Sequence, residues 1–230
     1  MKKVVLFGDG SVGRLAHFYL AHDSPLEVAA FTVDDADIKS GSLRGLPIVP
    51  FEDVQTLYPP GDFSMFISVG YALINKFRES KYDAAKDLGY DLISYISSKA
   101  TVWPDTSIGD NCFIMEHTVI QPFVTIGNNV MMWSGCQINH ESVIQDHCFL
   151  SSQVVVAGFT TIEPNCFLGL NATIRNGITV ARECVIGAGC VIMTNTQPRE
   201  VYAGHRGQLL PMSSDRLPPS ALGHVGTRDA

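Results

Sequence analysis

His140 and Gly158 lie eighteen residues apart in a stretch of the chain that repeats every six residues. An imidazole can remove a proton from an attacking amine or hydroxyl, and a bare backbone amide can stabilise the oxyanion that forms. Acyl transfer needs both groups. Glu141 directly follows His140 and could hydrogen-bond the imidazole, fixing its tautomer and raising its basicity. A solvated surface histidine is the alternative interpretation of His140.

The six-residue repeat must position these groups. Every sixth residue from Val102 to Ile192 is aliphatic, and the residue four places later is compact. This period is typical of a parallel β-helix, in which each hexad forms a short strand and a turn and three hexads complete a coil. Eighteen residues are then one coil, so His140 and Gly158 should be stacked neighbours on strands about 4.8 Å apart.

The cysteines share one phase of this repeat. All six occupy the compact inward position, which predicts buried, reduced thiols: Cys112, Cys136, Cys148, Cys166, Cys184 and Cys190. None of them forms a C-x-x-C pair, and no other cluster has the spacing of metal ligands, so we expect no metal site.

The first hundred residues instead alternate strand and helix patterns, which predicts a small parallel α/β sheet. The expected strands are residues 3–7, 28–33, 63–69 and 92–96, and the expected helices are residues 14–21 and 75–88.

Gly8-Asp9-Gly10-Ser11-Val12-Gly13 follows the first strand and matches G-x-G-x-x-G, with an acidic pair, Asp34 and Asp35, after the second strand. Such a turn places a helix N-terminus against a pyrophosphate. A nucleotide-linked sugar fits this short domain better than a dinucleotide. A purely structural turn is the alternative.

Pattern changes divide the chain into three parts. We expect a Rossmann-like nucleotide-sugar-binding domain over residues 1–98, a β-helix acyltransferase domain over residues 99–197, and a C-terminal extension, partly a loose tail, over residues 198–230.

The net charge of −7 argues against nucleic-acid partners. The N-terminal apolar run is too short for a signal peptide, and no segment reaches the roughly 20 apolar residues of a membrane span, so we expect a cytoplasmic protein with no membrane partner.

With Asn139-His140-Glu141-Ser142-Val143-Ile144 in the hexads and a glycine-turn domain before them, the chain resembles hexapeptide-repeat sugar acyltransferases of the sialic-acid O-acetyltransferase and bacillosamine-pathway N-acetyltransferase type. The resemblance covers roughly residues 2–205. It implies a left-handed β-helix, a homotrimer with active sites between neighbouring β-helices, acetyl-CoA as co-substrate, and a nucleotide-linked sugar held by the N-terminal domain.

The resemblance also assigns residues by position. It implies that His140 is the proton acceptor, Glu141 its orienting partner, and the Gly158 amide the donor near the thioester carbonyl. The positions that match acetyl-CoA contacts are Phe149, Leu170 and Ala188, and those that match sugar-nucleotide contacts are Gly10, Ser11, Val12, Asp34 and Asp35.

Three segments depart from the family pattern. The first turn lacks the histidine of Gly-His-Gly, which leaves the sugar open. The usual Gly-x-Asn with a following Arg is stretched into Gly70-Tyr71 with Asn75 and Arg78, which predicts a remodelled acceptor pocket. The usual Pro-Ala-Lys is replaced after the last coil, where Arg206 is a candidate partner for the CoA phosphate.

We therefore expect an acetyl-CoA-dependent acyltransferase that acetylates an amino or hydroxyl group of a nucleotide-linked sugar in surface polysaccharide or glycoconjugate biosynthesis. Two other hypotheses remain open. A non-catalytic nucleotide-sugar-binding scaffold would bind without turnover. A small NAD(P)-binding oxidoreductase would bind nicotinamide, but the chain shows no Tyr-Lys or hydride-site constellation for it.

Overall fold

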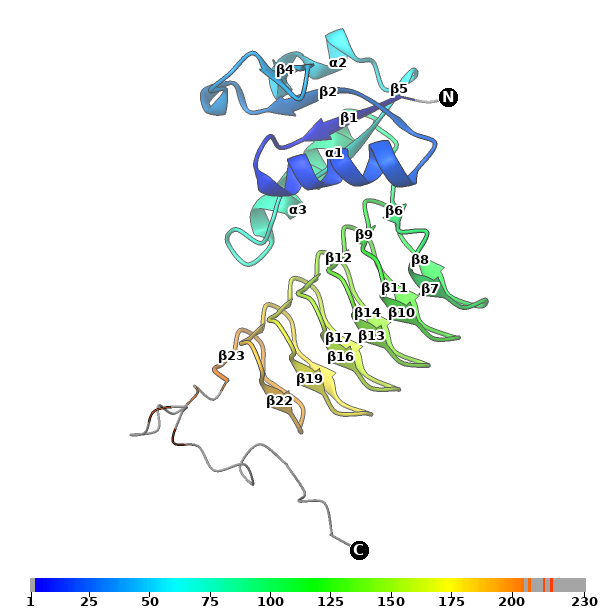
Figure 1. Cartoon of the computed structure of the whole chain (residues 1–230), viewed down its shortest axis with the longest axis vertical. Coiled ribbons are helices and arrows are strands. Elements are labelled where there is room, and N and C mark those ends of the chain that lie inside the picture. The colour runs from blue at the N-terminus through cyan, green and yellow to red at the C-terminus, as the bar shows by residue number, and fades with distance from the viewer. Residues whose placement is uncertain (1–2, 205–206, 208–212, 214–215, 217–230) are drawn as a thin grey trace, which may run out of the picture.

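The computed structural model describes residues 3–204, 207, 213 and 216. An N-terminal α/β layer lies across one side of a long stack of coils (Figure 1). Most of the expected C-terminal extension, including Arg206, lies outside the described residues. No helix in the described part of the chain is long and apolar enough to cross a membrane.

The N-terminal sheet has the order β3-β4-β2-β1-β5, and it is parallel except for β3 at one edge. Its strands are β1 (Lys3–Phe7), β2 (Glu27–Val33), β3 (Ser42–Leu43), β4 (Leu46–Pro50) and β5 (Phe63–Ile67). The helices are α1 (Ser11–Asp23), α2 (Val54–Leu57) and α3 (Lys76–Asp87), with 3-10 turns at Asp35–Asp37 and Phe51–Asp53.

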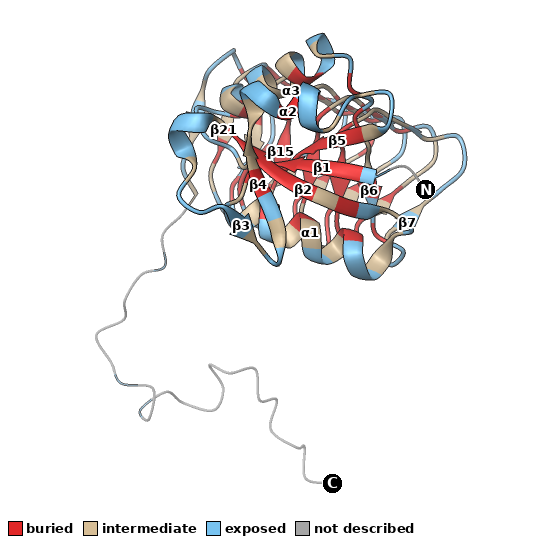
Figure 2. Cartoon of the chain, turned by 90° about the horizontal axis from the view of Figure 1, so that it is seen from above, coloured by how far each residue is buried: buried red, intermediate tan, exposed pale blue. Residues whose placement is uncertain are grey.

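Side chains alternate across this sheet, so its two faces have different partners. Val5 and Phe7 pack with residues of α2 and α3, whereas Val4 and Leu6 pack with α1 and with the coils. Figure 2 shows β1, β2 and β5 largely buried between these layers. One face of the sheet therefore shares an apolar cluster with coil residues such as Phe113 and Met131, and this cluster is separate from the interior of the coils.

The coils form three parallel sheets, which are the faces of a prism. The domain face, against which the N-terminal layer packs, contains β6 (Tyr95–Ile96), β9 (Phe113–Ile114), β12 (Met131–Met132), β15 (Phe149–Leu150), β18 (Phe167–Leu168), β21 (Val185–Ile186) and β23 (Val201–Tyr202).

The second face contains β7 (Thr101–Val102), β10 (Val119–Ile120), β13 (Gln137–Ile138), β16 (Val155–Val156), β19 (Thr173–Ile174) and β22 (Val191–Ile192). The third face contains β8 (Ser107–Ile108), β11 (Thr125–Ile126), β14 (Val143–Ile144), β17 (Thr161–Ile162) and β20 (Thr179–Val180).

From β6 to β22, strand partners in the coils are eighteen residues apart, as in Ile120↔Ile138 and Ile138↔Val156. Each aliphatic residue of the repeat therefore stacks on its equivalent in the next coil. The six cysteines are all free and buried in the same column-like core, as the sequence predicted.

The turns between the faces form three corners. The first corner joins the domain face to the second face (for example residues 133–136), the second corner joins the second face to the third (residues 139–142), and the third corner returns to the domain face (residues 145–148).

One expected strand was wrong. Residues 92–96 were expected to complete the N-terminal sheet, but only Leu92 forms a bridge there, with Met65. Tyr95 instead donates its N–H to Cys112 O and begins the domain face. The Rossmann-like sheet followed by a parallel β-helix nevertheless confirms the predicted fold class.

Candidate active site

His140 and Gly158 meet on the second corner. A β-carbon built on Gly158 would lie 2.9 Å from His140 Nε2 and 2.9 Å from Cε1, closer than ordinary van der Waals contact. The imidazole therefore occupies space that only a glycine leaves free. This confirms that the two residues are stacked neighbours, as the repeat predicted.

Three contacts hold His140 in place and leave its side chain exposed. The His140 N–H donates to Gln121 Oε1 at 2.9 Å, and the Phe159 N–H donates to His140 O at 3.0 Å. The Phe159 ring meets the imidazole edge to face, with centroids 5.0 Å apart. The Gly158 N–H donates to no acceptor in the described part of the chain, so it is available to a bound oxygen.

Glu141 follows in a left-handed conformation, with φ of 59°, and its side chain is exposed. Among the described residues, it has no hydrogen bond to His140. Its orienting role stays a prediction. Phe123 and Phe159 occupy the equivalent positions one coil to either side, with 57% and 59% of their surfaces exposed.

The positions predicted to contact acetyl-CoA lie in two places. Leu170 and Ala188 are exposed neighbours on the first corner, where the Gly189 N–H donates to Leu170 O at 2.8 Å. Phe149 lies on the domain face, only 3% exposed, and stacks on Phe167 beneath Tyr71. Only the two corner residues present their side chains to solvent.

The predicted sugar-nucleotide residues gather at the carboxyl end of the N-terminal sheet. Gly10 precedes α1, Ser11 and Val12 form its first turn, and Asp34 and Asp35 follow β2. A cleft of about 250 Å³ opens there, and it is lined by Phe7, Gly8, Asp9, Gly10, Val33, Asp34, Asp37, Lys39, Val69 and Phe77.

The glycine turn of this cleft is tight. A β-carbon on Gly13 would lie 1.9 Å from Gly8 O, so the helix can begin this close to β1 only without a side chain at that position. Of the predicted sugar-nucleotide residues, Gly10 and Asp34 line this cleft, whereas Ser11, Val12 and Asp35 lie beside it in the chain and are not among its lining residues.

Lys81 contacts three residues that line the cleft, and the sequence analysis did not identify it. Its Nζ pairs with Asp34 Oδ1 at 2.5 Å and lies 5.3 Å from the centre of the Phe7 ring and 5.6 Å from that of Phe77. Lys81 comes from α3, 47 residues after Asp34. It offsets part of the negative charge that would repel a phosphate-bearing ligand.

Asn75 and Arg78 do not line the cleft. Both side chains are fully buried and hydrogen-bond to the coils at the third corner. Backbone oxygens of the β-helix accept hydrogen bonds from both side chains, and a remodelled acceptor pocket stays a prediction. In the described part of the chain, no group of His, Cys, Asp or Glu could hold a metal ion.

The predicted sites lie on different sides of the chain. The N-terminal domain covers the domain face, and the second corner with His140 is the corner of the prism that does not border this face. His140 therefore lies across the β-helix from the cleft of its own chain, and on a different edge from Leu170 and Ala188.

Comparisons with known proteins agree with this architecture. Residues 105–140 match the family model described as bacterial transferase hexapeptide (six repeats), and residues 159–193 match the hexapeptide repeat of succinyl-transferase. A search of curated proteins gave no match.

Solved structures are similar over nearly the whole chain. The acetyltransferase domain of PglB from Neisseria gonorrhoeae superposes with a TM-score of 0.79 at 24% identity, covering 89% of this chain and 97% of that one. Its complex with acetyl coenzyme A gives 0.73 at 25% identity, with 83% and 92% covered. PerB from Caulobacter crescentus, in complex with CoA and GDP-perosamine, gives 0.74 at 22% identity, with 87% and 91% covered.

These matches confirm the predicted resemblance to hexapeptide-repeat sugar acyltransferases and the enzyme class, an acyltransferase.

Proposed function

We propose that this hexapeptide-repeat acyltransferase transfers the acetyl group of acetyl-CoA to an amino or hydroxyl group of a nucleotide-linked sugar, in surface polysaccharide or glycoconjugate biosynthesis. The observation that carries the proposal is the His140 imidazole lying over the bare Gly158. The solved relatives, a PglB acetyltransferase domain and a perosamine N-acetyltransferase, favour an amino acceptor.

The chemistry follows from these two groups. His140 Nε2 accepts the proton of the acceptor as its nitrogen or oxygen attacks the thioester carbonyl carbon. The Gly158 N–H donates to the carbonyl oxygen as negative charge develops on it. When the tetrahedral intermediate collapses, the carbon–sulfur bond breaks and the CoA sulfur takes the proton back from His140. Glu141 would favour the protonated imidazole.

The first corner fits an extended cofactor. Leu170 and Ala188 lie one coil apart along it, among small residues such as Gly187 and Gly189 that let a chain approach the backbone. At the end of this edge a cavity of about 290 Å³ is lined by Gly189, Cys190, Val191, Ile192, Tyr202, Ala203 and Gly204. Bound acetyl-CoA would supply the activated acetyl group.

A second copy of the chain must complete the site. His140 and the Leu170 edge occupy different corners of one prism, so the first corner of one chain has to face the second corner of the next. Large apolar side chains are exposed along the second corner, which favours a protein partner there: Trp103, Phe123, Phe159 and Met193. A contact between unlike edges gives a closed ring when the rotation between neighbouring chains closes, and we propose that it closes here as a homotrimer.

The nucleotide-linked sugar fits the N-terminal cleft. The first turn of α1 offers unpaired N–H groups and a partial positive charge to the pyrophosphate, and Lys81 adds a nearby cation. The rings of Phe7 and Phe77 offer apolar surface for the base.

Acetyl transfer to a panel of UDP-, dTDP- and GDP-linked amino and deoxy sugars tests the proposal. His140→Ala should lower kcat by roughly 10²- to 10⁴-fold, the usual contribution of a general base, and leave acetyl-CoA binding unchanged. Near-wild-type turnover by His140→Ala would overturn the mechanism. Tight nucleotide-sugar binding by a wild-type protein that acetylates no acceptor would favour the scaffold hypothesis.

A further inference from the structure

Arg78 is a buried cation with no carboxylate among its described hydrogen-bond partners. Its side chain is 0% exposed, and burial lowers its pKa to about 10, so it stays charged at neutral pH. The oxygens that accept its hydrogen bonds are Gly70 O (2.9 Å), Asn75 Oδ1 (3.1 Å), Asn129 Oδ1 (3.2 Å), Asn129 O (3.3 Å), His147 O (2.7 Å) and Cys148 O (3.2 Å).

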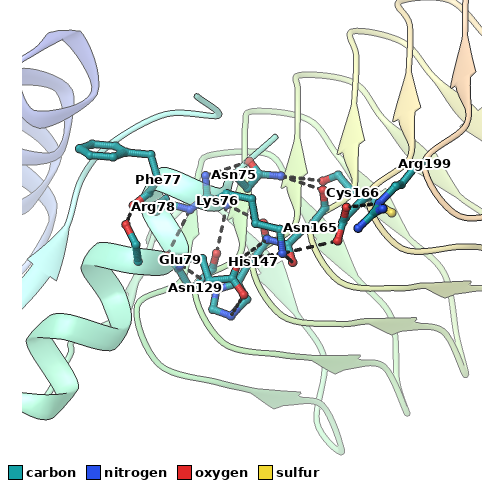
Figure 3. Close-up of polar contacts among 12 residues, drawn as sticks. Asn75, Lys76, Phe77, Arg78, Glu79, Asn129, His147, Asn165, Cys166 and Arg199 are labelled. Carbon is teal, nitrogen blue, oxygen red and sulfur yellow. Dashed lines mark hydrogen bonds and ion pairs between the residues drawn. The ribbon is translucent and has the colours of Figure 1, made fainter. Parts of the chain in front are cut away.

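These oxygens come from both parts of the molecule (Figure 3). Gly70 and Asn75 belong to the N-terminal domain, whereas Asn129 and His147 belong to successive coils. A buried guanidinium is expensive unless its donors are satisfied, and only the planar fork of arginine matches this many acceptors. The site therefore depends on arginine and holds the two parts together at one point.

The third corner provides a row of anchors for this contact. One residue per coil adopts a left-handed conformation there, with φ between 51° and 62°: Asn111, Asn129, His147, Asn165 and Glu183. Asn111 Oδ1 accepts from the Ile67 N–H at 2.8 Å and so pairs the outer edge of β5. Asn165 Nδ2 donates to Glu79 Oε2 at 3.0 Å. These third-corner residues therefore hold β5 and α3 against the coils.

The loop between β5 and α3 is strained and is clamped at both ends. Leu73, Ile74 and Asn75 all have positive φ, of 54°, 52° and 65°, which is unfavourable for a β-branched residue such as Ile74. Such strain persists only where neighbours over-determine the backbone. Arg78 holds Gly70 O at one end, and Asn75 Nδ2 donates to Asn165 O (3.2 Å) at the other.

This loop borders the proposed nucleotide-sugar site. A β-carbon on Gly70 would lie 3.9 Å from the Val12 side chain in the first turn of α1, and Val69 lines the cleft itself. The next residue, Tyr71, packs on Phe149 and Phe167 of the domain face. A shift of the loop would therefore move one wall of the cleft relative to the coils.

We propose that Arg78 is a positioning residue for acetyl transfer. By clamping residues 70–75 between the glycine turn and the third corner, it sets where a bound sugar lies relative to the coils, and thereby relative to His140 of the neighbouring chain. This inference rests on the proposed function. A misplacement of about 1 Å at a reacting group can cost roughly 10²-fold in rate.

Two variants remove the clamp and a third serves as control. Arg78→Lys keeps the charge but loses the fork. Asn75→Gly keeps the left-handed backbone, which glycine adopts freely, and loses the side-chain anchor. Lys86→Ala removes an ion pair of 2.7 Å with Asp110, which also joins α3 to the third corner but lies away from the loop.

Both clamp variants should lower kcat for the sugar by 10- to 100-fold, with the KM for acetyl-CoA and the slow hydrolysis of acetyl-CoA by water within about twofold of wild type. Loss of a purely structural arginine would lower the melting temperature without lowering kcat for the sugar selectively over the hydrolysis of acetyl-CoA. Lys86→Ala should show wild-type kinetics. Wild-type kcat in a folded Arg78→Lys or Asn75→Gly protein would overturn the inference and leave the proposed function intact.

Amide hydrogen exchange gives a readout that needs no turnover. Exchange in residues 8–13 and 70–75 should rise in Arg78→Lys and in Asn75→Gly, while the coils remain protected. Unchanged exchange in both segments would overturn the proposed clamp, whether or not the wild-type protein acetylates any sugar in the panel. A wild-type protein that acetylates no sugar would by itself refute only the proposed function.

Discussion

Gly158→Ala is the most direct test of the site geometry. The new methyl carbon would lie 2.9 Å from His140 Nε2, whereas non-bonded carbon contacts are comfortable at about 3.5–4.0 Å. The imidazole must therefore withdraw by roughly 0.6–1 Å, because the methyl group is fixed to a coil backbone. A displacement of that size predicts a fall in kcat of roughly 10- to 100-fold.

The loss should depend on the imidazole. In a His140→Ala background the two ring contacts at 2.9 Å are gone and only the contact with the backbone oxygen of residue 140, at 3.1 Å, remains, so the second substitution should cost clearly less than it does in the wild-type background. A double-mutant cycle then shows strong non-additivity. Gly41→Ala is the control, because a β-carbon there has no heavy atom within 4 Å.

Released CoA can be followed with a thiol reagent, since the protein thiols are buried and add little background. Acetyl-CoA affinity should stay within a few fold, because Leu170 and Ala188 lie on another corner. Wild-type kcat in Gly158→Ala, or full additivity with His140→Ala, would show that the imidazole does not act from the position seen here.

Further measurements address thiols, acid stability and assembly. Burial raises the pKa of Cys112 to about 12, so thiol labelling at pH 8 should be slow until denaturant is added, and rapid native labelling would contradict the inward register. Hydrogen bonds from Ser98 and Tyr95 hold the pKa of Asp23 well below its usual range, so the stability that this carboxylate contributes is present above about pH 4 and is lost as the pH falls further. Asp23→Asn should therefore reduce the fall in melting temperature at acid pH. An unchanged fall at acid pH would refute the assignment. Sedimentation should give three times the chain mass, and Phe123→Glu on the exposed second corner should shift it toward one chain mass; a stable, active wild-type monomer would refute the intersubunit site.

The repeat predicted much of the β-helix because its information is local and periodic. One inward aliphatic every six residues sets the strand, and the eighteen-residue coil sets the register, so the stacking of His140 on Gly158 follows without any long-range contact. The glycine turn and the acidic pair were recoverable for a similar reason, since each directly follows its own strand.

Which face carries the N-terminal domain did not follow from the period. The sequence does, however, indicate which face this is, through the outward-facing residue that directly precedes the aliphatic residue of each hexad. On every third hexad it is large and apolar, at Phe113, Met131, Phe149 and Phe167, and these side chains pack in the core shared with the N-terminal sheet. The other two faces carry residues such as Thr125 there.

The roles of Arg78 and Lys81 could not be read from the sequence. The partners of Arg78 are mostly backbone oxygens, which any residue supplies, and those of Lys81 come from three separate elements. Three left-handed residues of the third corner, Asn111, Asn129 and Asn165, are spaced by multiples of eighteen residues. This spacing does not indicate which residues of the N-terminal domain they contact. β4 was missed because Pro47 and Pro50 interrupt its pattern.

The location of the large outward residues also constrains how the enzyme can work. A fully buried phenylalanine contributes about 1.5–3 kcal/mol relative to an exposed one, so detaching the N-terminal domain from Phe113 and Phe149 would be costly. The domain therefore cannot swing around the prism to bring its cleft to His140 of the same chain. Under the proposed function, a nucleotide sugar bound in that cleft would meet an imidazole on the second corner of a neighbouring chain, and the proposed clamp at Arg78 would keep the cleft at a fixed distance from that imidazole.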